Sequence, residues 1–332
     1  MKYLIKRIMN MSYKGMFETI NKVKEKNNKL KLFILLDIVY CGLKYQAGYI
    51  DYYLFEMYNL NNKQRKTVLT RGINNSLIKK YNNPSYNYIF SDKIRFNQVF
   101  DKYMKRDWLE IKNDNLEEFE IFCKKHQTFI VKPISASCGK GVELIKSPKK
   151  NIKSLHEKLL NSGQILAEEV AIQCDEINDL HPYSINTIRV VTLKGKVVTA
   201  LLRVGNHKNI VDNFNNGGMV SPINIKTGII EYPAIDKHDN LYMKHPISKI
   251  SLVGFKIPSW KRVVELCEKA AEVVPEIGYI GWDVCVGNKK VTFIEGNEFP
   301  GHDLYQLPPH RTNGIGVYPM FKKTLEEEIK WK

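Results

Sequence analysis

Two short apolar segments near the C-terminus constrain the fold of this chain more than any other feature. Residues 281–286 (Gly-Trp-Asp-Val-Cys-Val) and 291–297 (Val-Thr-Phe-Ile-Glu-Gly-Asn) have the composition of β-strands, and residues 287–290 supply a turn between them. Each segment carries polar side chains within an otherwise apolar run. The sequence therefore predicts an antiparallel hairpin in which a few polar groups are built into apolar strands.

These polar groups form an oxygen-rich set. Asp283 projects from the first strand, whereas Glu295 and Asn297 are two residues apart on the second and so share one face. Two carboxylates and an amide oxygen suit Mg²⁺, which prefers hard oxygen ligands. For any one of these residues, the alternative is a polar strand face in solvent. We predict the three together as ligands of Mg²⁺, with Mn²⁺ as the alternative ion.

Size and composition indicate a globular protein without a membrane span. The chain has 332 residues, of which 43% are hydrophobic and 26% charged, enough for two or three domains. No stretch approaches the roughly 20 apolar residues of a transmembrane helix, and the N-terminus lacks the pattern of a secretory signal. The six cysteines are scattered, without metal-site spacing. A cytoplasmic protein with reduced thiols is expected.

The net charge of +16 is compatible with a nucleic acid or an anionic membrane as partner. The lysines, however, are dispersed among many asparagines and isoleucines, which is typical of a soluble surface. Two denser patches, residues 22–31 and 146–158, have solvated helix or loop faces as their simplest explanation. We expect no nucleic acid partner. Peripheral contact with a membrane stays open, and the sequence does not indicate an oligomeric state.

The order of predicted elements favours an α+β fold with an antiparallel sheet. Residues 1–88 have helix-like apolar spacing, and a turn cluster at 82–85 marks a boundary. Helical character is expected again over residues 91–124, with a turn near Asn113. The remaining predicted elements are strands at 129–133, 141–145 and 164–170, a helix at 151–161, two strands around a turn within 187–204, and a helix at 259–273.

A loop of small residues after the strand at 129–133 has the features of a phosphate-binding loop. Its sequence from Lys132 is Lys-Pro-Ile-Ser-Ala-Ser-Cys-Gly-Lys-Gly, and small residues let backbone N–H groups approach an anion. Lys132 would supply a point charge for phosphate. The loop lacks the spacing of a Walker A motif, and a strand follows it in place of a helix. A tight hairpin without function is the alternative.

Two arginines lie within apolar strand sequences. Arg189 is flanked by isoleucine and valine, and Arg203 by leucine and valine. An arginine in such surroundings requires an anionic partner. Either a structural salt bridge or an anionic substrate group would provide that partner.

Taken in order, these residues resemble the ATP-grasp superfamily. The resemblance covers about residues 91–305. It is carried by Asp92-Lys93, Val131-Lys132-Pro133, the Gly139/Gly141 loop, Glu168-Glu169-Val170, Arg189, Asp283, Glu295-x-Asn297 and Pro300-Gly301. More narrowly, several segments are similar to the sugar-transfer-associated ATP-grasp family. They are residues 181–192, 211–218, 245–246, 280–283 and 300–303.

The resemblance implies an α+β ATP-grasp fold, in which two subdomains enclose ATP, preceded by a mainly helical region. It places an ATP-grasp domain at residues 89–332, with a small subdomain at about 125–170 and a large one at about 171–320; residues 1–88 would serve substrate or partner binding. It also implies roles for individual residues. ATP would contact Lys93, Lys132, Ser137, Gly139, Lys140, Gly141, Glu168, Glu169 and Val170. The ribose carboxylate would be Asp175 or Glu176. Arg189, Arg203 and Asn213 would act on the reacting groups, and Asp283, Glu295 and Asn297 would hold the metal.

The activity implied is ATP- and Mg²⁺-dependent ligation of a carboxylate to an amine or thiol through an acyl phosphate. The narrower resemblance implies a role in cell-surface polysaccharide or glycoconjugate biosynthesis, with small-molecule substrates that carry sugars. Three alternatives remain open from the residues. One is a phosphotransferase of the same fold, and another is a nucleotide-binding module without catalysis. The third, kept open by the basic surface although no such partner is expected, is a nucleic-acid binder.

Overall fold

The computed structural model describes residues 12–134, 141–148, 151–206 and 212–329, which form two compact units. The first unit contains the residues up to Leu77 together with His302–Glu326, and the second contains Ile78–Gly301. The C-terminal segment thus packs with the helical N-terminal residues, a return of the chain that the sequence did not indicate. In that segment lie η4 (Pro308–His310), η5 (Thr312–Gly314) and most of α13 (Tyr318–Ile329).

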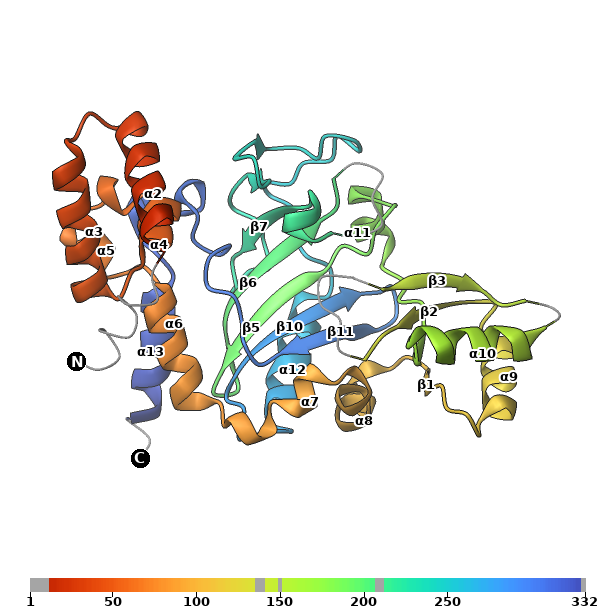
Figure 1. Cartoon of the computed structure of the whole chain (residues 1–332). Helices are drawn as coiled ribbons and strands as arrows, with labels where there is room; N and C mark the ends of the chain where they lie inside the picture. The colour runs from red at the N-terminus through yellow and green to blue at the C-terminus, as the bar shows by residue number, and fades with distance from the viewer. Residues whose placement is uncertain (1–11, 135–140, 149–150, 207–211, 330–332) are drawn as a thin grey trace. The chain divides into compact units, whose positions relative to one another are not determined.

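The first unit is helical, as residues 12–77 were predicted to be (Figure 1). Its elements are α2 (Tyr13–Lys26), α3 (Lys31–Tyr45), α4 (Tyr49–Leu54), η1 (Met57–Asn59), α5 (Asn62–Arg65) and α6 (Arg71–Tyr81), the last of which continues into the second unit. Its core is formed by side chains of α2, α3 and α4, including Val23, Ile34 and Tyr52. Helix α2 begins at Ser12, whose hydroxyl accepts a hydrogen bond from the Gly15 N–H.

The second unit is built on two antiparallel sheets. After η2 (Pro84–Tyr86), α7 (Tyr88–Ser91) and α8 (Lys93–Met104), a four-stranded sheet has the order β1-β4-β2-β3. Its strands are β1 (Trp108–Glu110), β2 (Thr128–Lys132), β3 (Glu143–Lys146) and β4 (Leu166–Glu169). Helices α9 (Leu116–Lys125) and α10 (Ile152–Ser162) pack against it, with Phe119, Phe129 and Leu159 in the shared core. The expected helical stretch 91–124 is therefore wrong in part, because β1 divides it into two helices.

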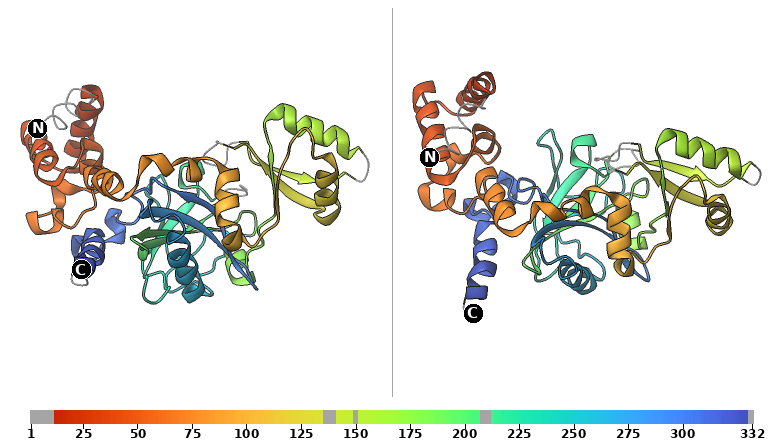
Figure 2. Two further views of the ribbon diagram at one scale, coloured as in Figure 1. Left: turned by 90° about the horizontal axis from the view of Figure 1, so that it is seen from below. Right: turned by 60° about the horizontal axis from the view of Figure 1, so that its bottom comes forward.

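A seven-stranded sheet follows α11 (Asp175–Leu180) and has the order β11-β10-β5-β6-β7-β8-β9. Its strands are β5 (Ile188–Leu193), β6 (Lys196–Val204), β7 (Met219–Ile223), β8 (Ala234–Ile235), β9 (Leu241–Tyr242), β10 (Tyr279–Val286) and β11 (Val291–Asn297), with η3 (Phe214–Asn216) before β7 and α12 (Trp260–Ala271) before β10. Figure 2 shows α8 and α12 on the same side of this sheet. Phe100 of α8, Val263 of α12 and Trp282 of β10 meet in its core.

Candidate functional site

The predicted hairpin forms, and its register brings the oxygen-bearing residues together. In the antiparallel pair β10–β11, Asp283 lies opposite Glu295 and Gly281 lies opposite Asn297. Directly opposed residues in an antiparallel ladder point to the same side of the sheet. Asp283, Glu295 and Asn297 therefore share one face, as the sequence predicted, and that face lies opposite the core packed by α8 and α12.

A β-bulge makes this arrangement compatible with a packed core. The register shifts at Asp283/Val284, where the partner changes from Glu295 to Phe293 and leaves Ile294 as an extra residue on β11. Because of the bulge, Phe293 and Glu295 face opposite sides although they are two residues apart. Phe293 is fully buried, and its ring stacks on Trp282 with 4.7 Å between ring centroids.

Both predicted arginines reach the same face and contact Asp283. Arg189 is the cross-strand partner of Asp283 in the β5–β10 pair. Its Nη2 donates to Asp283 Oδ2 at 2.8 Å, and Arg203 Nη1 donates to the same oxygen at 3.0 Å. Burial raises the pKa of the Asp283 carboxyl, but Arg189 and Arg203 outweigh that effect and lower the pKa below its ordinary value.

Glu295 behaves in the opposite way. Burial raises the pKa of its carboxyl, and the neighbouring Asp283 carboxylate raises it further, against the opposing effect of Arg189. The two carboxylates thus differ in electrostatic environment although they are directly opposite each other on the adjacent strands β10 and β11. A cation placed between them would favour ionisation of both.

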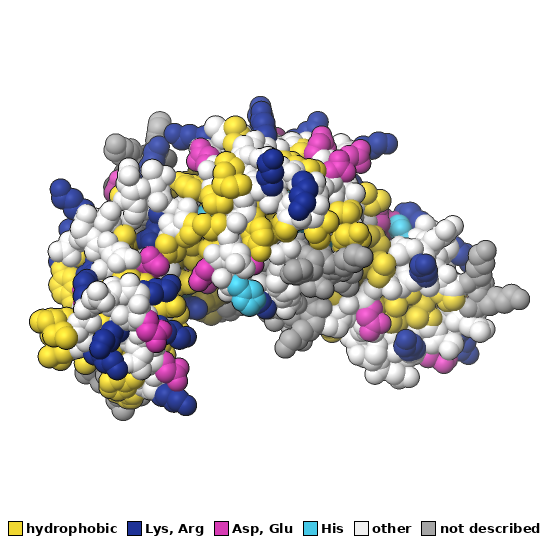
Figure 3. All heavy atoms as spheres, turned by 90° about the horizontal axis from the view of Figure 1, so that it is seen from above, with side chains coloured by type: hydrophobic (Ala, Val, Ile, Leu, Met, Phe, Trp, Pro, Cys, Tyr) yellow, Lys and Arg dark blue, Asp and Glu magenta, His cyan; other side chains and the backbone are white. Residues whose placement is uncertain are grey.

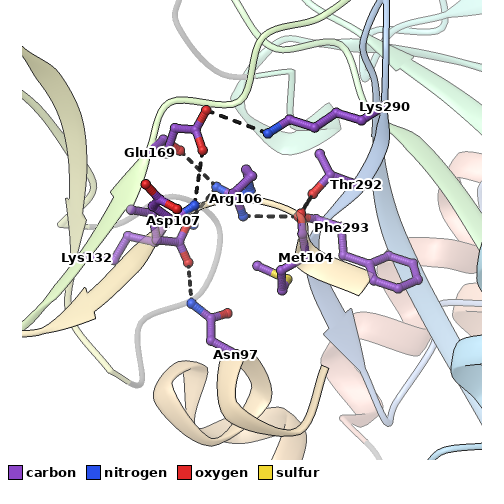
Figure 4. Close-up of polar contacts among 10 residues, drawn as sticks. Asn97, Met104, Arg106, Asp107, Lys132, Glu169, Lys290, Thr292 and Phe293 are labelled. Carbon is purple, nitrogen blue, oxygen red and sulfur yellow. Dashed lines mark hydrogen bonds and ion pairs between the residues drawn. The ribbon is translucent and has the colours of Figure 1, made fainter. Parts of the chain in front are cut away.

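A second charged cluster surrounds Glu168 near the end of β4, and Figure 4 labels its neighbours Asn97, Arg106 and Lys132. This carboxylate is 2% exposed and accepts hydrogen bonds from three donors. Lys132 Nζ donates to Oε2 at 2.7 Å, Arg106 Nη1 to Oε2 at 3.0 Å, and Asn97 Nδ2 to Oε1 at 2.9 Å. Burial disfavours the charged carboxylate, but Arg106 and Lys132 outweigh it and lower the pKa of Glu168 to about 2.

Arg106 also joins the two sheets of the second unit. In Figure 4 its side chain extends from the segment before β1 toward β11. Nη1 donates to the Glu169 carbonyl at 3.2 Å, and Nη2 donates to the Phe293 carbonyl at 3.0 Å. One buried guanidinium therefore ties the end of β4 to the strand that carries Glu295 and Asn297.

A cavity of about 230 Å³ brings residues of both groups together. Lys93 and Asn97 of α8 line it, as do Glu168, Glu295 and Asn297. Burial lowers the pKa of the Lys93 ammonium, and the Glu295 carboxylate opposes that effect. The cavity thus places a lysine, an amide and carboxylates predicted for nucleotide and metal around a single space.

Comparison with models of known protein families identifies the family of this chain. The family model described as sugar-transfer associated ATP-grasp matches residues 72–324, about three quarters of the chain. The chain belongs to that family. Its fold is accordingly an α+β ATP-grasp fold preceded by a helical region, as the sequence resemblance implied. No curated protein matches significantly.

Solved structures that resemble this ATP-grasp protein are described as ligases or synthetases. One is the ATP-grasp ligase PsnB with its precursor peptide and AMPPNP, at 15% identity and a TM-score of 0.44, covering 74% of this chain and 61% of PsnB. The chain therefore spans less than two thirds of that protein. A D-alanine–D-alanine ligase from Bacillus anthracis aligns at 15% identity and a TM-score of 0.44, covering 78% of this chain and 75% of the ligase. The D-cycloserine synthetase DcsG aligns at 11% identity and a TM-score of 0.40, covering 71% of this chain and 70% of DcsG.

The hairpin residues of this ATP-grasp protein fit a divalent cation by the chemistry of their donors. Two carboxylates and one amide face the same side of the β10–β11 pair, and their oxygens are the donors that a hard divalent cation prefers. Within the described ranges, three or more His, Cys, Asp or Glu side chains nowhere gather into a metal cage. Asp283 would have to give up part of its contact with the arginines to bind an ion.

The remaining described residues that were predicted to contact ATP lie around the cavity and the adjoining strands. Glu169 Oε2 accepts from the Asp107 N–H at 3.0 Å, and Oε1 lies 3.6 Å from Lys290 Nζ, so its side chain points toward Lys290 (Figure 4). Val170 directly follows β4. Gly141 has a left-handed φ of +71°, which favours glycine at the end of the predicted phosphate-binding loop. Ser137, Gly139 and Lys140 lie outside the described residues.

Two further predicted residues lie at element starts. Glu176 and its alternative Asp175 both occupy the first turn of α11. Asp175 Oδ1 accepts from Asn288 Nδ2 at 3.4 Å. Asn213 caps η3 through a hydrogen bond from the Asn215 N–H to its side-chain oxygen. The choice between Asp175 and Glu176 stays a prediction.

Sequence reasoning missed Arg106 and Asn97. Arg106 lies in a polar Lys-Arg-Asp segment, and Asn97 lies within an ordinary amphipathic helix. Neither position carries a local signal, because their partner Glu168 is 62 and 71 residues away in the chain. A buried carboxylate at a strand end does predict cationic and amide partners in general, but only the fold identifies which side chains they are.

Proposed function

We propose that this ATP-grasp protein is an ATP- and Mg²⁺-dependent ligase that joins a carboxylate to an amine, or to a thiol, through an acyl phosphate. The observation that carries the proposal is the shared face of the large sheet. There Asp283, Glu295 and Asn297 lie beside Arg189 and Arg203, next to a cavity that Lys93 and Glu168 also line. Phosphoryl transfer depends mainly on positioning and on charge neutralisation, and these residue types supply both.

In the proposed reaction, an oxygen of the substrate carboxylate attacks the γ-phosphorus of ATP and ADP leaves. The amine nitrogen then attacks the acyl carbon, inorganic phosphate leaves, and the nitrogen loses a proton. Lys93 and Lys132 would bind phosphate oxygens of ATP, and the backbone of Glu168–Val170 would border the adenine. Arg189 and Arg203 would stabilise the charge on the transferred phosphoryl group. Asn213 would contact the reacting carboxylate.

Mg²⁺ would be held by Asp283, Glu295 and Asn297, and when bound it would neutralise charge on the phosphate oxygens. Asp283 would share its oxygens between the ion and the two arginines, which now both donate to Oδ2. Arg189 and Arg203 would thereby gain donor capacity for an anionic substrate. The substrate class proposed is a sugar acid and an amine in the assembly of a cell-surface glycoconjugate, in line with the family description.

ADP release from ATP tests the proposal over a panel of uronic acids and amino acids, each with and without an added amine. We expect ADP only with a carboxylate, and a hydroxamate when hydroxylamine replaces the amine, because hydroxylamine traps acyl phosphates. ADP release in which phosphate stays on the acid and no hydroxamate forms would favour the phosphotransferase.

Thermal unfolding with and without ATP and Mg²⁺ separates the remaining alternative. A nucleotide-dependent stabilisation without ADP release over the whole panel is the expected behaviour of a non-catalytic binding module. The Glu295→Gln variant serves as the inactive control, and Glu231→Gln, on the exposed turn with Asn224, is the matched variant that should stay active.

A further inference from the structure

Helix α3 of the first unit is apolar on two opposite sides. One side carries Ile34, Ile38, Cys41 and Tyr45, which are buried in the core of that unit. The other side carries Leu32, Leu36, Val39 and Leu43, with the same spacing of four, three and four residues. The two sets are offset by two residues, or about 200° on a helix, and so point in opposite directions.

The outward set, together with Phe33, is the largest run of exposed apolar side chains on any one helix of the described chain, and we call it the α3 ridge. Its exposed fractions are 63% for Leu32, 60% for Phe33, 55% for Leu36, 48% for Val39 and 60% for Leu43. The ridge extends over about 16 Å of helix. A helix that is apolar all round is normally buried, and an apolar ridge in water marks a contact surface.

The charges around the α3 ridge indicate what it contacts. Exposed Lys31 and Lys44 lie at its two ends, and Lys44 Nζ is 4.9 Å from the centroid of the Tyr40 ring beside the ridge. The only acid of the helix, Asp37, is neutralised by Arg65 through hydrogen bonds of 2.7 and 2.6 Å. Residues 12–77 contain eleven Lys and Arg against five Asp and Glu.

We propose that the α3 ridge docks this protein on the surface of an anionic phospholipid membrane. Leucine and phenylalanine would enter the boundary between headgroups and acyl chains, while the lysines at the ends would meet anionic headgroups. Figure 3 shows hydrophobic side chains together with lysines and arginines at the left-hand edge of the visible face. In the described part of the chain, no helix is long and apolar enough to cross a membrane. Because α3 also buries its other side within its own unit, it would lie along the surface.

A second copy of the chain is the main competing occupant. A dimer through this surface would bring Lys31 and Lys44 of both copies close together without an acid on the helix to balance them, because Asp37 is already paired. Like charges at such an interface oppose association. An anionic lipid surface instead attracts the same lysines, and so explains both the apolar and the charged parts of the ridge.

Sedimentation with vesicles tests the proposal on the full-length protein. We expect it to pellet with vesicles of phosphatidylglycerol and phosphatidylcholine, and less with phosphatidylcholine alone. The double variant Leu36→Gln/Leu43→Gln should bind the anionic vesicles at least about tenfold more weakly, because two leucine side chains no longer leave water. The variant Lys31→Gln/Lys44→Gln should lose binding chiefly to the anionic vesicles.

Two matched variants keep the test specific. Ile121 of α9 is 65% exposed in the other unit, so Ile121→Gln removes an equally exposed apolar side chain and should leave vesicle binding unchanged. The full-length variant Lys2→Gln/Lys6→Gln/Arg7→Gln removes three N-terminal charges, and should retain most of the binding. Thermal unfolding should be similar for all variants, because each replaced side chain in α3 and α9 is largely exposed.

Three results would overturn the proposal. The first is wild-type protein that stays in the supernatant with both kinds of vesicle. The second is a Leu36→Gln/Leu43→Gln variant that pellets as the wild type does, or an N-terminal charge variant that alone abolishes pelleting. The third is a wild-type dimer in sedimentation velocity that becomes monomeric in the leucine variant without any vesicle binding, which would assign the ridge to contact between copies.

Discussion

Lys132 donates to Glu168 across 2.7 Å in a site where both side chains are almost completely buried. The lysine predicted to bind phosphate is therefore held by a carboxylate. Arg106 contacts the same oxygen of Glu168 at 3.0 Å, so this carboxylate keeps a cation even when Lys132 turns toward another anion. The arrangement fixes the lysine in place, and Glu168 would stay paired with Arg106 under the proposed binding of a nucleotide phosphate by Lys132.

Replacing Lys132 by methionine should weaken ATP binding at least about tenfold, because a phosphate contact worth over 1.4 kcal/mol is lost. The fold should be kept, since Arg106 and Asn97 still satisfy Glu168. Isothermal titration with AMPPNP measures the effect. Lys146→Met, on exposed β3 of the same sheet, is the control and should bind normally. Equal affinity in both variants would show that Lys132 is only structural.

The Glu168 cluster should make stability depend on pH. Its pKa falls from an ordinary 4.5 to about 2 on folding. Such a depressed pKa adds on the order of 3 kcal/mol to the free energy of unfolding above pH 4.5. This contribution is lost as the pH falls from 4.5 to 2. Urea unfolding should therefore show Glu168→Gln well below wild type at pH 7, with a difference that shrinks toward pH 2.

The exposed Glu117→Gln on α9 is the control for that series, because a solvent-exposed glutamate contributes little to the free energy of unfolding. Its difference from wild type should stay small at every pH. A gap between Glu168→Gln and wild type that is the same at pH 7 and pH 3 would contradict the assigned ion pairs.

The two carboxylates of the hairpin should respond differently to neutralisation. Asp283→Asn removes the anion that Arg189 and Arg203 share, so it should lower the melting temperature by several degrees. Glu295→Gln relieves the repulsion that raises the Glu295 pKa, so the melting temperature should hold or increase. Both variants should lose ADP release about 100-fold or more if the two residues hold the metal. An active Glu295→Gln enzyme would refute that ligand assignment.

Gly205 should tolerate no side chain. A Cβ there would overlap the buried His181 ring and the Ser184 hydroxyl, which are themselves hydrogen-bonded to each other at 2.8 Å. Gly205→Ala should cost about 1–3 kcal/mol in chemical unfolding, because neither neighbour has room to move. Gly42→Ala in α3 meets only an ordinary contact of 3.5 Å with the Ala47 carbonyl. That variant should be neutral or slightly stabilising. Equal losses in both would contradict the packing around His181.

Local sequence patterns were sufficient to predict those helices and strands whose apolar periodicity or turn residues lie within one short segment. The hairpin at 281–297 followed from two apolar runs around a turn, and the helix at Trp260–Ala271 from apolar periodicity. The strand Trp108–Glu110 was missed because three residues are too few to show a period of two. The bulge at Ile294 was missed for a related reason, since alternation alone places Phe293 and Glu295 on one face.

The sequence by itself determined which residues carry charge inside apolar strands, and the order of its motifs was enough to indicate the family. Tertiary structure alone decided the partners of those charges. Arg106 meets Glu168 and Phe293 only after strands 62 and 187 residues away have been brought together. The physical reason is that a buried charge requires an opposite charge or a hydrogen bond, but that requirement specifies no position in the chain, and only the packed sheets do.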